Sequence, residues 1–221
     1  MDPNAPGYAG FKDYSPTFLR IYDWWVLGVM AKRVWKTPVP PMVDAYSRRV
    51  GRRHLDVGPG TGYLLDAADL PDDVEITLLD PNPHVLAHTA ERLAGHDVVT
   101  VEANVLEPLP VDGPFDSAAL SNVLHCLPGP MDTKGTAIGH VADVLGPDGV
   151  LFGSTVLGLD ADHTRSARAF LTMVNRQGGF DNAGDTVEGL RSILDASFAE
   201  VDIEVLGSIA LFQASRPHRG A

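Results

Sequence analysis

Residues 54–62, HLDVGPGTG, decide the fold of this chain. The apolar run His54–Val57 predicts a short buried strand that leads directly into Gly58, Gly60 and Gly62. Glycines at alternate positions let the backbone turn tightly and pass very close to a bound ligand. The stretch therefore predicts a strand, a ligand-binding loop and the start of a helix.

The same loop argues against two classes of nucleotide-binding protein. The dinucleotide fingerprint G-x-G-x-x-G needs a third glycine at position 63, and Tyr63 stands there. A nicotinamide-dependent oxidoreductase is therefore disfavoured, although it stays an alternative. A P-loop is excluded, because no Gly-Lys-Ser/Thr follows the glycines.

Alternating strand and helix patterns continue the chain from about residue 53. The predicted strands are His54–Val57, Glu75–Leu79, Val98–Glu102, Phe115–Leu120 and Val150–Leu157. Segments with helical spacing lie between most of them, which indicates a parallel sheet with helices on both faces. Val105–Pro114 is too short and proline-rich for a good helix, so we expect that crossover to lack one.

Two further strands are predicted at the end of the chain, around Val201–Val205 and Ile209–Phe212. Only about two residues, Gly207 and Ser208, are left for the loop between these two strands. A parallel crossover needs a dozen or more residues, so these two strands must be antiparallel.

Three acidic residues are predicted to begin helices. Asp132 precedes a segment with apolar residues at helical spacing, and Asp162 precedes another. Asp185 with Glu188 matches a capping box.

The first 50 residues carry an aromatic stripe at helical spacing, and residues 36–41 (KTPVPP) separate it from a short helix near Met42–Val50. Such a stripe is usual for core packing, but it could also form a lid in which Tyr14, Tyr22 and Trp25 face a ligand. We predict a helical lid over residues 1–52, one cofactor-binding domain over 53–214 and a polar tail over 215–221.

Composition limits the function classes. The 221 residues carry a net charge of −12, which disfavours general nucleic-acid binding. Cys126 is the single cysteine, so neither an internal disulfide nor a cysteine-built zinc site is possible. No apolar run reaches the roughly 20 residues that a membrane span needs, and no secretory signal is evident. We therefore expect a cytoplasmic protein without membrane partners.

Asp80 ends the second predicted strand in LLDPNP, twenty residues past Gly60. An acid at this point can accept two hydrogen bonds from the diol of a ribose. Together with the glycine loop, Asp80 indicates a ligand that contains a nucleoside.

Five motifs in series carry a family resemblance: LDVGPGTG, LLDPNP, EANVLEPLP, FDSAALSNVLHCLPG and VLGPDGVLFGST. With them the chain resembles class I S-adenosylmethionine-dependent methyltransferases over residues 53–214, and most closely those of quinone biosynthesis and secondary metabolism. The resemblance implies an α/β fold, a three-layer Rossmann-like sandwich whose seven-stranded, mostly parallel sheet has an antiparallel last strand. It also implies S-adenosylmethionine as cofactor and S-adenosylhomocysteine as product.

The resemblance assigns cofactor contacts to individual residues. Those expected at the methionine part are Asp56, Gly58, Gly60, Gly62, Ser121 and Asn122. Those expected at the ribose and the adenine are Asp80, Pro81, Asn82, Asn104 and Val105. Asn104 stands where the family often has Asp, and an amide can replace the carboxylate because it also accepts a hydrogen bond.

His125 is the predicted catalytic residue, because it follows the fourth strand at the edge where the cofactor is expected. It would remove a proton from the acceptor. The alternative is that it lines the pocket or bonds to the backbone, and Cys126 beside it is predicted to contact substrate. His84, His88, Asp160 and Asp162 lack the pattern of a metal site, so no metal is expected.

The predicted function is methyl transfer to a small, fairly apolar acceptor through an oxygen, nitrogen or carbon nucleophile. Alternatives are a rearrangement or cyclisation with the cofactor as spectator, and a non-catalytic binding module. Methylation of protein or RNA is disfavoured by the absence of a recognition domain and by the negative charge. A homodimer is possible, and the acceptor itself is not specified by the sequence.

Overall fold

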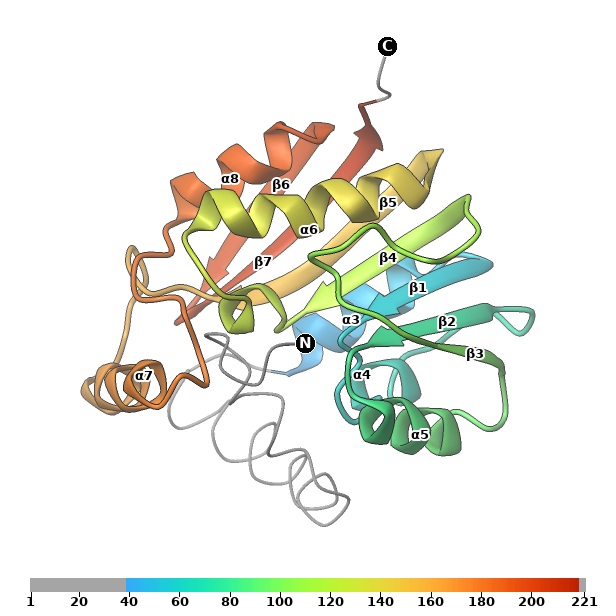
Figure 1. The fold of residues 1–221 in the computed structure, drawn as a ribbon, viewed down its shortest axis with the longest axis horizontal. Coiled ribbons are helices and arrows are strands. Elements are labelled where there is room, and N and C mark those ends of the chain that lie inside the picture. Colours follow the sequence, from blue (N-terminus) through green and yellow to red (C-terminus); the bar gives the residue numbers. More distant parts are fainter. Residues whose placement is uncertain (1–38, 219–221) are drawn as a thin grey trace.

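The structure is a computed structural model, and it describes residues 39–218 (Figure 1). Its strands are β1 (Arg53–Val57), β2 (Glu75–Asp80), β3 (Asp97–Glu102), β4 (Phe115–Ser121), β5 (Leu145–Val156), β6 (Phe198–Leu206) and β7 (Ile209–Pro217). Its helices are α3 (Pro40–Arg49), α4 (Tyr63–Asp66), α5 (Pro83–Arg92), α6 (Met131–Val144), α7 (Arg165–Arg176) and α8 (Val187–Asp195), with a 3₁₀ turn η2 (Leu124–Cys126).

The strands form one seven-stranded sheet in the order β3-β2-β1-β4-β5-β7-β6. β1 to β5 are parallel, whereas β7 pairs antiparallel with both β5 and β6. This confirms the predicted antiparallel last strand, and Gly207 supplies a left-handed residue in the β6–β7 turn (φ 60°). No helix lies between β3 and β4, as the proline-rich segment predicted.

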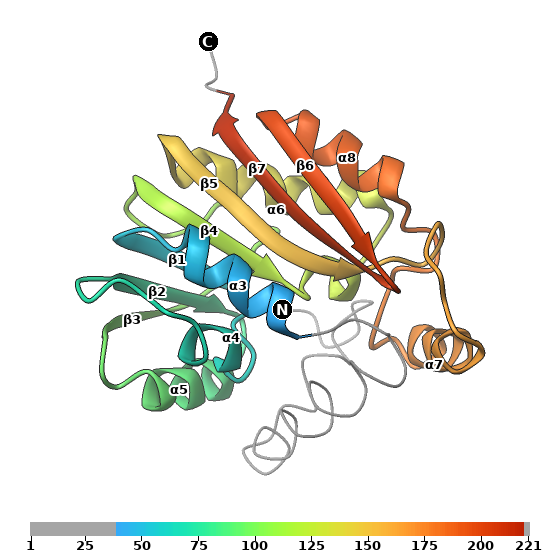
Figure 2. The ribbon, with the colours of Figure 1, turned by 180° about the vertical axis from the view of Figure 1, so that it is seen from behind.

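Helices cover both faces of the sheet (Figures 1 and 2). On one face α6 and α8 pack through Ile138, Val141 and Leu190, all fully buried. On the other face α3 and α5 contribute Tyr46 and Leu86 to a second apolar cluster. The predicted three-layer α/β sandwich is therefore confirmed.

α3 lies within the segment that the sequence assigned to a lid. It crosses the face of the sheet behind β1 and β4 in the view of Figure 1. The Tyr46 ring packs edge-on against Phe152 of β5, with ring centroids 5.0 Å apart, and against His54 of β1. This part of the chain is a layer of the sandwich, whereas Tyr14, Tyr22 and Trp25 lie outside the described residues.

The predicted end of the last strand was wrong. β7 continues to Pro217, because Ser215 pairs with both Val150 and Glu200, so the polar tail does not begin at residue 215.

Threonines, and not the predicted aspartates, cap α7 and α8. Thr164 accepts a hydrogen bond from the Ala167 N–H, and Thr186 accepts one from the Gly189 N–H. α6 begins after Pro130 with no side-chain cap, which leaves Asp132 in its first turn. The prediction that aspartates cap these helices was wrong, because several polar residues near each helix start could accept the same hydrogen bond from the backbone.

Among residues 39–218, no helix is both long and apolar enough to cross a membrane.

Candidate cofactor and active site

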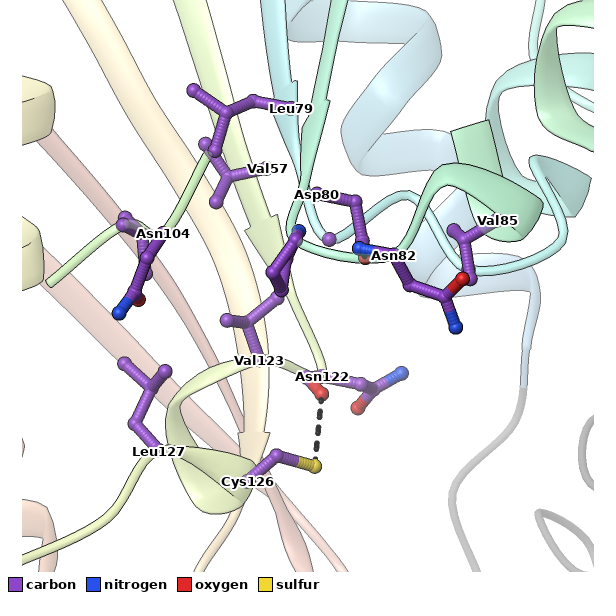
Figure 3. Close-up of a pocket in the computed structure, with 14 residues that line it drawn as sticks. Val57, Leu79, Asp80, Asn82, Val85, Asn104, Asn122, Val123, Cys126 and Leu127 are labelled. Carbon is purple, nitrogen blue, oxygen red and sulfur yellow. Dashed lines mark hydrogen bonds between the residues drawn. The ribbon is translucent and has the colours of Figure 1, made fainter. Parts of the chain in front are cut away.

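A crevice opens at the carboxyl ends of the parallel strands, between β1 and β4 (Figure 3). The strand order reverses at this point, because β2 lies on one side of β1 and β4 on the other. In open α/β sheets ligands bind at such a switch point, since loops from neighbouring strands diverge there. The predicted cofactor residues that line it are Gly58, Gly60, Asp80, Pro81, Asn82, Asn104, Val105 and Asn122.

The glycine loop after β1 requires glycine at two positions for steric reasons. Gly58 has φ 65°, and a Cβ built there would lie 2.6 Å from Val123 Cγ2. Gly62 has φ 75°, and its Cβ would lie 2.8 Å from Thr89 Cγ2. The Gly58 N–H donates to the Leu79 carbonyl of β2, so the loop is pinned to the neighbouring strand end. We call the loop Gly58–Gly62 the glycine cradle: it packs so closely against Val123 and Thr89 that a side chain at Gly58 or Gly62 would collide with them.

Asp80 is held at the end of β2 by its own neighbour. Its Oδ1 accepts a hydrogen bond of 2.7 Å from the Asn82 N–H, while Asn82 Oδ1 caps α5 by accepting from the His84 N–H. Burial raises the pKa of Asp80 to about 7, and the bond from Asn82 opposes that rise. One carboxylate oxygen is thus oriented by the backbone, and the other can face a ligand in the crevice.

Asp56 lies deeper than the crevice wall, with 2% of its surface exposed. Its Oδ1 has no hydrogen-bond partner within residues 39–218. Burial raises the pKa of Asp56 to about 8, a hydrogen bond with the Tyr46 side chain lowers it, and the charge of Asp80 raises it. Together with Asp56, Gly62 and Ser121 are the predicted cofactor residues that do not line the crevice.

Asn104 and Asn122 occupy the opposite wall of the crevice from α5 (Figure 3). Asn104 Oδ1 accepts from the Leu106 N–H at 3.1 Å. Asn122 has φ 60°, a left-handed conformation, and its N–H donates to the Ser154 carbonyl of β5. A non-glycine residue held in this region is strained, and such strain is concentrated at ligand sites.

His125 lies behind this wall and is 3% exposed. Its Nδ1 accepts a hydrogen bond of 3.1 Å from the Val156 N–H, and its ring contacts Phe180 with centroids 4.3 Å apart. Burial lowers the pKa of His125 to about 3, and the charge of Lys134 lowers it further.

These contacts favour the backbone-bonding alternative for His125. A neutral imidazole whose Nδ1 accepts a bond carries its proton on Nε2, where it is a donor. A base role would require the ring to give up the bond to Val156. The catalytic assignment of His125 stays a prediction.

Cys126, next in the chain, does line the crevice. Its Sγ lies 3.9 Å from the Asn122 carbonyl (dashed in Figure 3). Burial raises the pKa of Cys126 to about 12, so the thiol stays neutral and acts as an apolar wall rather than a nucleophile.

The sequence did not reveal a buried ion pair behind His125. Lys134 Nζ of α6 lies 2.6 Å from Asp185 Oδ2 and donates to the Asp181 carbonyl at 2.7 Å. The Asp181 N–H in turn donates to the His125 carbonyl. These bonds tie the loop that carries Phe180 to η2. The only signal in the sequence was a lysine at an apolar position of the α6 face.

The sequence also showed no sign that Tyr46 of α3 bonds to the Asp56 side chain. The apolar crevice residues Val57, Leu79 and Leu127 could have been found as the neighbours of the motif residues.

Within residues 39–218, no three His, Cys, Asp or Glu side chains are placed to hold a metal ion, and His84 and His88 gain no further ligand.

Comparison with known proteins identifies the family. A family model for a methyltransferase domain matches residues 55–151. Demethylluteothin O-methyltransferase of Streptomyces thioluteus is 40% identical over 94% of this chain and 90% of its own length. The physcion biosynthesis cluster O-methyltransferase of Aspergillus chevalieri is 34% identical over 98% and 99%.

Solved structures share the fold. The N-methyltransferase NodS of Bradyrhizobium japonicum, in complex with S-adenosylhomocysteine, superposes with a TM-score of 0.58 at 16% identity, over 81% of this chain and 85% of NodS.

The chain belongs to the class I S-adenosylmethionine-dependent methyltransferases. It is an enzyme that transfers a methyl group.

Proposed function

We propose that the crevice binds S-adenosylmethionine and that the enzyme transfers its methyl group to a hydroxyl of a small, fairly apolar secondary metabolite. The observation that carries this proposal is the pairing of the glycine cradle with Asp80 at the β1–β4 switch point. Two relatives that match nearly the whole chain are named O-methyltransferases.

The residues of the crevice fit this cofactor. Gly58 and Gly60 line the crevice without side chains, so a flexible aminoacyl chain can pass close to the backbone, while Gly62 lets the loop pack against Thr89 of α5. The second carboxylate oxygen of Asp80 suits a ribose diol, and the Asn104 amide with Val105 suits an adenine edge. The buried acid Asp56 and the acid Asp80 suit a ligand that carries positive charge.

The protein has to align and dehydrate the reacting atoms. The sulfonium of the cofactor supplies an already activated methyl group. The chain holds the acceptor in line with the breaking bond, and the apolar walls at Val123, Cys126 and Leu127 exclude water. In this proposal Tyr14, Tyr22 and Trp25 contact the acceptor, and His125 is the candidate base.

Calorimetry with S-adenosylhomocysteine tests the cofactor half of the proposal. The wild-type protein should bind, and Asp80→Asn should weaken binding about tenfold or more, because an amide cannot accept bonds from both ribose hydroxyls. Glu91→Gln, a change of the same kind on the exposed face of α5, is the matched control and should bind as wild type. Unchanged affinity in Asp80→Asn would contradict the ribose assignment.

Product mass tests the reaction half. Incubation with the cofactor and a panel of phenolic secondary metabolites should give S-adenosylhomocysteine and a product heavier by one methylene. A product of unchanged mass, with the cofactor intact, would instead show the rearrangement alternative.

A further inference from the structure

Tyr46 has no place in the predicted cofactor site, because it belongs to α3 and precedes the glycine loop by more than ten residues. Its side chain is nevertheless buried to 2% exposure beneath the carboxyl ends of β1 and β4. α3 brings it there by crossing the sheet face (Figure 2). The ring packs edge-on against both Phe152 and His54, which stack on one another.

The Tyr46 hydroxyl joins two groups at those strand ends. It donates a hydrogen bond to the Asp56 carboxyl and accepts one from the Ser121 side chain. Asp56 has a second oxygen, Oδ1, that is buried and has no partner within residues 39–218. A buried carboxylate oxygen without a donor is costly, and a cationic ligand would relieve that cost.

We propose that Tyr46 is a positioning residue for cofactor binding: its hydroxyl orients Asp56 behind the crevice wall and stabilises the ionised carboxylate, whose charge attracts the ammonium group that S-adenosylmethionine and S-adenosylhomocysteine share. The inference rests on the proposed function, since it takes S-adenosylmethionine or S-adenosylhomocysteine as the ligand. It adds a residue from α3 to the site, and it links binding to the loss of one proton from Asp56 to solvent.

The electrostatics agree with this role. Without a ligand, burial raises the pKa of Asp56 to about 8, so near neutral pH the carboxyl is largely protonated. The bond from Tyr46 lowers that pKa, and the nearby charge of Asp80 raises it. A cation bound beside Asp56 lowers it further, which requires proton release below pH 8.

Other groups around Asp56 are already engaged. His54, on the same strand, is neutral because burial lowers its pKa to about 3, and its Nδ1 bonds to Ser117. On α3 itself, Arg48 pairs with Asp44, and Arg49 bonds to Gln213 of β7. Ser121 of β4 is uncharged. Among residues 39–218, Asp80 is thus the charged neighbour that acts on Asp56, together with the hydroxyl of Tyr46.

The test is calorimetric titration of S-adenosylhomocysteine from pH 6.5 to 9, in two buffers of different ionisation enthalpy, so that released protons are counted. Wild type should bind more tightly as the pH rises toward 8, by up to about tenfold per unit, and should release a proton at pH 7. Tyr46→Phe should bind roughly tenfold more weakly at pH 7, with its pH midpoint about one unit higher and its affinity recovering at pH 9.

Three further variants separate positioning from packing. Asp56→Asn should retain only the pH dependence of the ligand's own amino group. Ser121→Ala, which keeps the Tyr46 ring, should shift the midpoint in the same direction by less. Phe152→Leu disturbs the packing of the Tyr46 ring but keeps the hydroxyl, so it should lower the melting temperature without moving the pH midpoint.

The outcomes are distinct. An unchanged pH profile in Tyr46→Phe would overturn the proposal whatever Ser121→Ala does, as would the absence of proton release by a wild type that binds. No binding by wild type at any pH would instead refute the proposed cofactor, and this inference with it.

Discussion

The buried pair Lys134–Asp185 gives the sharpest test of how the site is held together. Both side chains are almost fully enclosed, at 0% and 3% exposure, and the Nζ–Oδ2 distance is 2.6 Å. Lys134→Met keeps most of the aliphatic volume but removes the charge and also the bond to the Asp181 carbonyl. Asp185 is then left in the interior without its cation.

The expected loss follows from that geometry. Removing one partner of a buried ion pair costs about 3–5 kcal/mol, because the remaining charge is uncompensated. For a protein of this size that corresponds to a melting temperature lower by about 6–20 °C. Burial already raises the pKa of Asp185, and Lys134 opposes the rise, so in the variant the pKa rises further. Since the folded variant then binds more protons than the unfolded chain, its stability falls as the pH increases.

Urea unfolding at pH 5.5 and pH 8 measures this effect. Lys134→Met should be destabilised at both values, and more at pH 8, where keeping Asp185 protonated is harder. The double variant Lys134→Met/Asp185→Leu should recover most of the loss, because it leaves no buried charge. Arg48→Met, which breaks an ion pair at 71% and 52% exposure, is the control and should change stability by no more than about 1 kcal/mol. A Lys134→Met loss below about 1 kcal/mol at pH 8, or a double variant no better than the single one, would refute this account.

Two other predictions concern the crevice and the pH dependence of stability. Gly58→Ala should weaken cofactor binding about tenfold or more, because its Cβ meets Val123 and its φ is positive, whereas Gly139→Ala, with open space around it, should bind normally; equal affinities by calorimetry would contradict the cradle. In the free protein, Asp56 and Asp80 have raised pKa values of about 8 and 7, so the folded protein keeps protons that the unfolded chain has already lost, and stability should fall between about pH 6.5 and 8 until both groups have ionised. His54 and His125 have pKa values lowered to about 3, so both stay neutral in the folded protein, whereas in the unfolded chain they take up protons below about pH 6.5. That uptake favours the unfolded chain and offsets the stability gained from protonated Asp56 and Asp80, so stability should level off below about pH 6.5. Melting curves across pH 4.5–8.5 would show this, and a melting temperature that rises from pH 6.5 to 8 would contradict it.

The local pattern of the chain was enough to predict the sheet. Each parallel strand is a short run of Val, Leu and Ile, and such runs are buried wherever helices cover both faces. The two-residue link at Gly207 and Ser208 left no choice but an antiparallel pair. Strand ends and helix caps were less certain, as Pro217 and Thr186 show, because several neighbouring residues satisfy the same local rule.

The cofactor side of the site was also predictable, since its residues follow strand ends in sequence. Gly58 follows β1 directly, Asp80 is the last residue of β2 and Asn104 comes two residues after β3, and the carboxyl ends of parallel strands meet at one edge. A motif of this kind fixes both the residue type and its place in the fold.

The remaining features depend on contacts between distant parts of the chain. Lys134 and Asp185 are 51 residues apart, and nothing in either local sequence indicates that they meet. His125 was predicted to face substrate from its position after β4, but the direction of its ring is set by the Val156 N–H, 31 residues away.

The sequence by itself determined the strand that leads into the glycine loop, the antiparallel end of the sheet and the acid at the β2 terminus, because short-range periodicity and loop length constrain these features. Only the tertiary structure decided which side chains are buried against one another: Tyr46 beneath Asp56, Lys134 against Asp185 and His125 against β5. Burial and partner choice arise when separate elements pack, and they set the protonation states on which the chemistry of this enzyme depends.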